Sequence, residues 1–415
     1  MRGMRLADAG SRATPIPIAL MPIRSLSVLT ALLHAYIALR LLPALAMLTP
    51  AWPLALAALA ISALTIPLPF VSRGREHGAS VGELLQWTGL ISMGWFSSLF
   101  VATLLRDAGL LLAWLASVLF GAPVPWHAVL PWSAMAVLLL ATLVSMVGFL
   151  NARRTADVKR VEVPISGLPA ALEGFTIAQL SDIHVGPTIR SAYIQRIVDA
   201  VNRLGADAIA ITGDLVDGSV AELREHIAPL AGLRARHGTF VVTGNHEYYA
   251  GAHAWIDELR RLGLKVLLNE HVVLQTRNVR GAQNDEELFE SQLVLAGVTD
   301  YTAGHFDAAH ASDPHLALFD APPLVHTRVL LAHQPRSATL AAQAGYQLQL
   351  SGHTHGGQFF PWNLFVPMQQ PFTAGLHRLH DMWVYVSRGT GYWGPPKRFG
   401  APSEITLLTL VMARG

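Results

Sequence analysis

The sequence predicts an all-α membrane region followed by a soluble α/β domain. Charge is spread unevenly, because only 12 of the 30 Lys and Arg and 28 Asp and Glu residues fall within the first 150 of 415 positions. Long apolar runs fill that first part, whereas the rest alternates short apolar runs with amphipathic stretches. Polar residues able to bind metal ions follow several of the short runs directly. These observations place a membrane region first and a catalytic domain second.

The overall composition excludes some partners and some kinds of site. The formal net charge is only +2 and no long basic run occurs, so we do not expect a nucleic-acid polymer as partner. Cysteine is absent, which rules out disulfides and thiolate metal ligands without fixing the compartment. A metal site in this chain must therefore use oxygen and nitrogen ligands.

Residues 1–25 form a basic N-terminal segment, and residues 26–150 form the predicted transmembrane region. About 20 apolar residues cross a bilayer core. The four predicted spans are residues 26–48, 53–71, 85–105 and 129–150. The apolar run at 109–120 is short, so we expect it to lie in the interface or to re-enter the membrane.

Basic residues beside the spans predict the topology. The N-terminal segment, Arg73, Arg75 and the basic stretch at 153–160 share one side if the number of spans is even, and the positive-inside rule makes that side cytoplasmic. A fifth span at 109–120 would move the second half to the opposite face. With four spans, we expect an integral protein of the cell (inner) membrane with a cytoplasmic catalytic domain.

After a predicted linker at 151–170, residues 171–415 alternate strands and helices. The first predicted strands are 175–180, 206–211 and 239–242, with helices at 189–204, 220–235 and 253–262. Five later strands are predicted at 293–298, 328–331, 346–350, 383–386 and 404–410, and an exposed polar loop at 277–290. This order predicts an α/β sheet that gathers ligands at the carboxyl ends of its strands.

Five polar motifs follow the predicted strands. They read Ser-Asp-Ile-His at 181–184, Thr-Gly-Asp at 212–214, Thr-Gly-Asn-His-Glu at 243–247, Ala-His-Gln at 332–334 and Ser-Gly-His-Thr-His at 351–355. The candidate metal ligands are Asp182, His184, Asp214, Asn245, His333, His353 and His355. Alone, each motif is more often a turn with satisfied polar groups, but together they indicate a metal site. Oxygen and nitrogen ligands suit Mn²⁺, Fe or Zn²⁺ better than Ca²⁺.

A set of this kind suits two-metal chemistry on a phosphoester. Two cations about 3.5–4 Å apart can activate a water and clamp the attacking and leaving oxygens. Asp214 carries a carboxylate that could bridge the two ions. His246, beside Asn245, is the candidate catalytic acid because a protonated imidazole can supply the proton that an alkoxide leaving group needs.

The order of these motifs resembles that of the calcineurin-like metallophosphoesterases, and longer matches resemble a membrane-anchored subgroup of phosphohydrolases. Such matches include 181–184, 245–249, 331–335, 352–358, 387–391 and 402–405. The resemblance implies a four-layer α/β/β/α sandwich with a dinuclear site at one edge. One divalent or trivalent ion would take Asp182, His184, Asp214 and His355, and the other would take Asp214, Asn245, His333 and His353. Glu247 stands where the family often has Asp, at a position not expected to bind metal.

The predicted function is metal-dependent hydrolysis of a phosphoester by a dimetal-activated hydroxide at a membrane. A lipid-linked or envelope phosphate is one candidate substrate, and membrane lipids are expected partners; the sequence leaves oligomeric state open. Arg388 is a candidate phosphate contact. The alternatives are a nucleotide phosphodiesterase and a non-catalytic membrane sensor of metal or phosphate. A sensor could lack His246 or a ligand, but this sequence retains them all.

Overall fold

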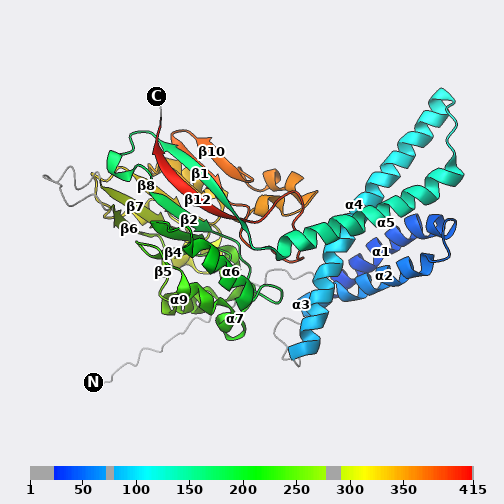
Figure 1. Ribbon diagram of the computed structural model, residues 1–415, viewed down its shortest axis with the longest axis horizontal. Coiled ribbons are helices and arrows are strands. Elements are labelled where there is room, and N and C mark those ends of the chain that lie inside the picture. The colour runs from blue at the N-terminus through cyan, green and yellow to red at the C-terminus, as the bar shows by residue number, and fades with distance from the viewer. Residues whose placement is uncertain (1–22, 72–78, 277–290, 414–415) are drawn as a thin grey trace, which may run out of the picture.

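The computed structural model describes residues 23–71, 79–276 and 291–413, and it has two parts (Figure 1). A bundle of long helices occupies one end and a domain of two sheets occupies the other. The predicted basic segment before Ile23, the Arg73 and Arg75 loop and the polar loop at 277–290 lie outside the described residues.

The bundle contains α1 (Ile23–Ala46), α2 (Trp52–Thr65), α3 (Leu68–Val71), α4 (Ala79–Phe120) and α5 (Trp126–Arg153). Among the described residues, four stretches are long and apolar enough to cross a membrane, in agreement with the prediction. They are Ser25–Ala46, Trp52–Phe70, Gly82–Phe120 and Trp126–Arg153.

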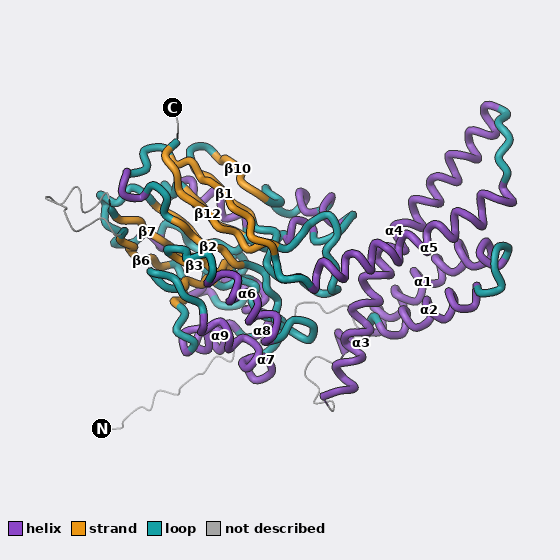
Figure 2. Tube along the Cα trace, viewed as in Figure 1, coloured by secondary structure: helices purple, strands orange, loops and turns teal. Residues whose placement is uncertain are grey.

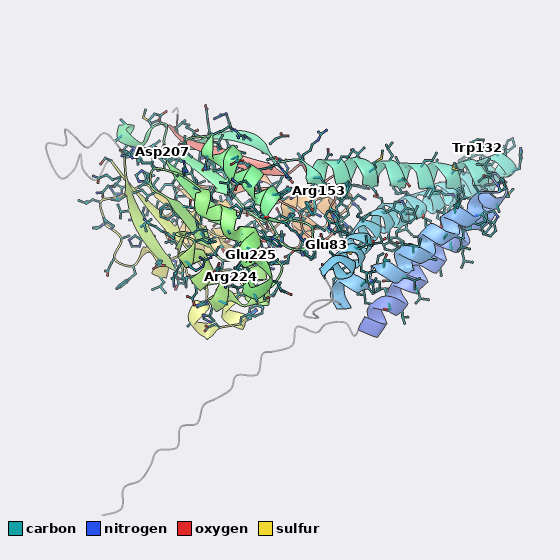
Figure 3. The ribbon with its side chains drawn as sticks, turned by 60° about the horizontal axis from the view of Figure 1, so that its bottom comes forward. Glu83, Trp132, Arg153, Asp207, Arg224 and Glu225 are labelled. Carbon is teal, nitrogen blue, oxygen red and sulfur yellow. The ribbon has the colours of Figure 1, made fainter. Side chains whose placement is uncertain are left out.

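Contacts between the helices fix their relative directions. His34 of α1 stacks on Phe96 of α4 with ring centroids 4.4 Å apart, and Arg40 pairs with Asp107 further along both helices at 2.7 Å. These helices therefore run parallel, and α5 runs back along α4. Figure 3 shows Trp132, early in α5, far from the two-sheet domain, and Arg153, the last residue of α5, beside that domain. The start of α1 and the end of α5 consequently share the domain side.

The sequence predicts that the third span ends at residue 105 and that 109–120 is a separate run. In the structure, residues 109–120 continue the same helix, α4. The charges of Arg106 and Asp107 do not interrupt the helix, since Arg106 bonds Ser133 at 2.9 Å and Asp107 bonds Arg40. A helix of 42 residues is about 63 Å long if straight. The bilayer core is about 30 Å thick, so α4 extends well beyond it.

The domain contains two six-stranded mixed sheets. The first has the order β1 (Asp157–Ile165), β12 (Glu404–Met412), β2 (Thr176–Leu180), β3 (Ala208–Thr212), β4 (Thr239–Val242) and β5 (Lys265–Val266). The second has the order β10 (Gly375–Leu379), β11 (Met382–Val386), β9 (Leu348–Ser351), β8 (Arg328–Leu331), β7 (Gln292–Gly297) and β6 (Glu270–Gln275). Strands β2 to β5 are parallel, as are β11, β9, β8 and β7.

The two sheets pack face to face and helices cover their outer faces. Ile177 and Leu408 of the first sheet share one core with Val329 and Leu348 of the second. The outer helices are α6 (Ser191–Asn202), α7 (Val220–Ile227) and α9 (Ala252–Arg261) on the first sheet and α11 (Ala338–Gln343) on the second. Figure 2 shows α6, α7 and α9 gathered along one side of the strands. The four-layer α/β/β/α fold implied by the motifs is confirmed.

Several predicted boundaries were wrong for identifiable reasons. The expected linker at 151–170 contains β1, which pairs in parallel with β12 from Asp157 opposite Glu404 onward, because Val163 and Ile165 are buried between the sheets. The helix expected at 220–235 ends at Ile227, since Pro229 follows and the chain tightens into a 3-10 turn. Strands β5, β6 and β10 were not predicted.

Candidate metal centre

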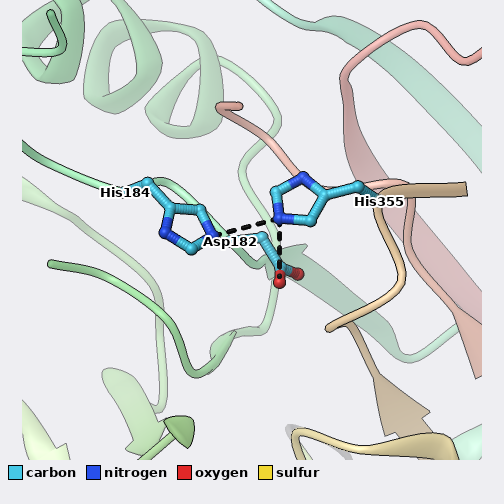
Figure 4. A group of neighbouring side chains, drawn as sticks. All are labelled: Asp182, His184 and His355. Atoms are coloured by element: carbon cyan, nitrogen blue, oxygen red, sulfur yellow. Dashed lines mark hydrogen bonds and ion pairs between the residues drawn. The ribbon is translucent and has the colours of Figure 1, made fainter. Parts of the chain in front are cut away.

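The predicted ligands meet where the central strands of both sheets end. Asp182, Asp214 and Asn245 follow β2, β3 and β4, while His333 follows β8 and His353 follows β9. The structure brings Asp182, His184 and His355 together in one group and Asp214, His333 and His353 in a second, with the potential ligand atoms of each group within 4.8 Å of one another. Figure 4 shows the first group converging from separate loops.

Asp214 lies between the two groups. Its Oδ2 is 3.1 Å from Nε2 of His333 and 3.9 Å from Nε2 of His184. Nε2 of His184 is 3.0 Å from Nε2 of His355, and Nδ1 of His353 is 3.2 Å from Nε2 of His333. The Asp214 carboxylate is thus placed to serve both groups, as the bridging role requires.

The donor set fits cations, because hydrogen-bond acceptors face one another across the site. His333 donates from Nδ1 to the Thr212 carbonyl at 2.7 Å, and His184 donates from Nδ1 to Asp217 at 2.9 Å. Nε2 of each ring therefore faces the site, where it can offer a lone pair to an ion. Oδ1 of Asn245 is buried without a hydrogen-bond partner among the described residues. A buried carbonyl oxygen and inward-facing ring nitrogens are what an ion requires.

The backbone is strained at the candidate ligands. Five of them have φ values from 51° to 71°, in the left-handed region: Asp182, His184, Asp214, His353 and His355. Such conformations cost about 1–3 kcal/mol each for residues other than glycine and persist only where surrounding bonds enforce them. One such bond runs from the His353 amide to the Asp182 carboxylate at 2.9 Å.

The motif glycines are required by the close approach of these loops. A Cβ at Gly213, which has φ +86°, would lie 2.9 Å from Nδ1 of His333. A Cβ at Gly352 would collide with the side chains of Ser181 and Asp182. Both positions therefore need glycine for the ligand loops to converge.

The sequence reasoning missed Asp217. Its Oδ1 accepts hydrogen bonds from Nδ1 of His184 at 2.9 Å and from Nδ1 of His246 at 2.6 Å. Burial alone would raise the pKa of Asp217, but the two imidazoles outweigh it and hold that pKa well below its ordinary value. Asp217 thus fixes one ligand ring and the candidate acid together. In the sequence, the one indication of a role for Asp217 was its position three residues after the candidate ligand Asp214.

His246 lies at the edge of the site with its side chain mostly buried. Its Nε2 is 4.0 Å from Oδ2 of Asp214, and its ring meets Trp393 edge-on at 6.0 Å between centroids. Burial lowers the pKa of His246, but the carboxylates of Asp214 and Asp217 outweigh that effect and raise the pKa to about 9. The ring is therefore protonated at neutral pH, as a general acid must be.

Glu247 binds the backbone of two loops that carry candidate ligands. Its carboxylate accepts hydrogen bonds from the backbone amides of Asp214 at 3.0 Å, Leu215 at 2.7 Å and Gly244 at 2.6 Å. One side chain thus ties the loop after β3 to the loop after β4.

We expect Glu247→Gln to destabilise the fold by about 1–3 kcal/mol, because an amide nitrogen would face backbone donors in a buried position. The measurement is the thermal unfolding midpoint of the detergent-solubilised protein. Glu225→Gln, at an exposed position on α7, is the control and should leave the midpoint unchanged. Equal midpoints for the two variants would contradict this role.

Arg388 is engaged by another residue. Its Nη1 donates to Oε2 of Glu404 at 3.2 Å, and its side chain packs beside Gly356, which follows the ligand His355. It lies near the site, but its role as a phosphate contact stays a prediction.

Arg398 holds His355 in place. It is fully buried and donates from Nη1 to the His355 carbonyl at 2.9 Å, and its Nη2 lies 3.0 Å from Nδ1 of the same ring. It also donates to the carbonyls of Gly391 and Ala401. Burial and then the Arg398 charge hold the pKa of His355 well below its ordinary value, so the ring stays uncharged.

The neighbouring Lys397 joins this loop to the membrane helices. Its Nζ donates to the Gly94 carbonyl of α4 at 2.7 Å and to the hydroxyls of Ser98 in α4 and Ser145 in α5. The Arg398 amide donates to the Gly148 carbonyl of α5 at 2.8 Å. Two adjacent residues therefore connect the helix bundle to a candidate metal ligand.

Comparison with known proteins identifies relatives with this domain. A family model described as calcineurin-like phosphoesterase matches residues 175–357. A bovine transmembrane protein with metallophosphoesterase domain is 40% identical over 315 residues, covering 74% of this chain and 69% of the relative. An uncharacterized metallophosphoesterase of Campylobacter jejuni is 35% identical, covering 63% of this chain and 64% of its own. A solved structure of a dimetal phosphatase from Danio rerio aligns with a TM-score of 0.30 at 10% identity, over 52% of this chain and 88% of its own.

Proposed function

The chain belongs to the calcineurin-like phosphoesterases, and we propose that it hydrolyses a phosphoester at the surface of the membrane that holds its helices. The observation that carries this proposal is the convergence of Asp214 and five other candidate ligands in two adjacent groups. The oxygen of Asn245, the seventh candidate, is buried and has no hydrogen-bond partner among the described residues. The helix bundle and the transmembrane relative support the membrane part.

We assign the ligands to two ions of Mn, Fe or Zn. Asp182, His184 and His355 would hold one ion and Asn245, His333 and His353 the other, with Asp214 shared. Bound there, the ions would supply a polarised phosphoryl group and a water with a lowered pKa. The protein's own part is to orient the ligand rings through Asp217, Thr212 and Arg398.

We assign the proton of the leaving oxygen to His246. Asp217 bonds Nδ1 of this ring, which leaves Nε2 directed toward the site, 4.0 Å from Asp214. The same Asp217 oxygen holds His184, so the acid and a ligand keep a fixed separation. The rings of Trp393 and Tyr249 lie beside the His246 ring, with centroids 6.0 and 5.3 Å away.

The finer proposal is a lipid-linked or envelope phosphoester in the cell (inner) membrane, with the domain on the cytoplasmic side. Its support is the contact between the site and the bundle: Lys397 is buried between α4 and α5, one residue from the arginine that holds His355. The positive-inside count gives the cytoplasmic side. Among the described residues, no feature favours a nucleotide substrate over a lipid-linked or envelope phosphoester.

The test uses the full chain in detergent or nanodiscs, because Lys397 contacts the helices. Hydrolysis of bis-(p-nitrophenyl) phosphate and p-nitrophenyl phosphate is measured after chelation and after adding Mn²⁺, Zn²⁺ or Mg²⁺. We expect activity that is lost with chelator and restored by metal. A folded, metal-loaded protein inactive on both esters and on membrane lipid extracts would overturn the proposal in favour of the sensor.

We expect His246→Ala to lower the rate by about 10²–10⁴-fold, the range for loss of a general acid, while leaving bound metal unchanged. The measurements are steady-state hydrolysis and metal content by mass spectrometry. His315→Ala, at an exposed position, is the control and should match the parent. A variant that keeps its rate would remove His246 from the chemistry.

A further inference from the structure

An exposed apolar segment follows the last metal ligands. We call residues 359–368 the apolar loop; it contains two 3-10 turns, Trp362–Leu364 and Val366–Met368. The sequence has no Asp, Glu, Lys or Arg between Thr354 and His377. The exposed fractions are 52% for Trp362, 61% for Leu364 and 80% for Met368, and Phe360 and Phe365 are about half exposed.

The apolar loop is an ordered surface. The Trp362 amide donates to the Phe359 carbonyl at 3.0 Å, and the Trp362 and Phe365 rings lie 5.9 Å apart. Asn363 packs closely over Gly357, where a Cβ would collide with its backbone. A fixed backbone therefore presents large apolar side chains outward, which soluble surfaces rarely do over a continuous area.

The apolar loop lies beside the membrane helices. Its first residue, Phe359, is buried, and the Lys397 ammonium sits 5.0 Å from the centre of its ring. That ammonium is the group bonded to both α4 and α5. Figure 1 shows the orange segment that includes these turns at the end of the domain facing α5. The exposed side chains are thus continuous with the contact between the domain and the bundle.

We propose that the apolar loop inserts into the headgroup region of the same membrane that the four helices cross. Trp and Phe side chains favour this region, and a segment without charge enters it at low cost. The loop cannot lie deeper, because its irregular backbone would leave polar groups unsatisfied in hydrocarbon. The occupant of this surface is therefore the lipid interface.

This placement fixes the depth of the candidate metal centre relative to the membrane surface. The loop begins four residues after His355, so anchoring it holds that ligand loop against the headgroups. Resting on the proposed hydrolysis, the inference is that the site takes a phosphoester carried by a membrane lipid without extracting the lipid from the bilayer.

The test exploits the absence of cysteine in the chain. Leu364→Cys and Met368→Cys are each labelled with an environment-sensitive fluorophore in nanodiscs that hold one protein copy, with nitroxide lipids as quenchers. The control is Asp381→Cys, because the Asp381 side chain is fully exposed. Asp381 lies near Ile165, which ends β1 on the side of the domain remote from α5. Hydrolysis of bis-(p-nitrophenyl) phosphate, p-nitrophenyl phosphate and membrane lipid extracts, measured separately, reports the proposed function.

We expect both labels in the apolar loop to show a blue shift and loss of fluorescence with headgroup-level nitroxides, and the Asp381→Cys label to show neither. Two unquenched labels in the loop would overturn the proposal, whatever the hydrolysis assay gives. A blue shift that appears only with two copies per disc would overturn it in favour of a second copy of this chain. Quenching without hydrolysis would support the membrane contact and count against the proposed activity alone.

Discussion

Asp214→Asn is expected to lower phosphoester hydrolysis by about 10³-fold or more, since metal-ion catalysis is worth several kcal/mol and each 1.36 kcal/mol is tenfold. Asp214 is the shared group of the site, with its Oδ2 3.1 Å from His333 and 3.9 Å from His184. The substitution keeps the shape of the side chain. Its Oδ1 position can still accept the hydrogen bond from the His246 amide.

The measurements are steady-state kinetics and the number of ions bound per chain. We expect fewer than two ions in the variant at metal concentrations that saturate the parent. Asp199→Asn is the matched control, because the Asp199 side chain is exposed on α6 and accepts a hydrogen bond from Gln195, one turn earlier in the helix. Full metal occupancy and the parental rate in the variant would show that Asp214 does not bridge two metal ions.

The ligand positions could be predicted because each lies directly after a buried strand. Parallel strands end at one edge of a sheet, so Asp182, Asp214 and Asn245 had to approach one another once β2, β3 and β4 were recognised. The left-handed backbone at Asp182 and Asp214 could not be read from the sequence, because it depends on contacts such as the bond from the Asp182 amide to the Gly213 carbonyl.

The missed contacts span long sequence distances. Arg398 contacts His355 from 43 residues away. From its Gly- and Pro-rich surroundings, the sequence predicted a loop that shapes substrate entry or one that closes the fold, and it did not indicate His355 as the partner. β1 was mistaken for a linker because its partner, β12, is at the other end of the domain. Local periodicity reports which face of an element is buried. It does not report which distant element covers that face.

Arg398→Lys is expected to lower metal affinity and hydrolysis by about 10–100-fold, the usual loss when a residue that orients a metal ligand is changed. The guanidinium spans the His355 ring, the His355 carbonyl and the carbonyls of Gly391 and Ala401. An ammonium has three donors on one atom and cannot reach all of these acceptors. Burial lowers the pKa of Arg398 to about 10, so it is charged at neutral pH and the comparison retains the charge.

The measurements are metal titration and, independently, the thermal midpoint, so a positioning role can be separated from loss of fold. Arg328→Lys is the matched control, since Arg328 also donates to a backbone carbonyl but at the start of β8, the end remote from His333. We expect that control to keep parental metal affinity. If Arg398→Lys lowers the midpoint but binds metal as the parent does, Arg398 supports the loop and not the ligand.

The position of Arg398 also explains why the bundle and the site form one unit. Its amide bonds α5 through the Gly148 carbonyl, its own carbonyl accepts from Asn151 of α5, and its side chain ends at His355. A shift of α5 relative to the domain must therefore move the backbone from which the guanidinium reaches the ligand. Because Lys397 fixes the same loop to α4 at Gly94, both helices constrain that backbone. The membrane region is thereby part of the support of the metal centre and not only an anchor.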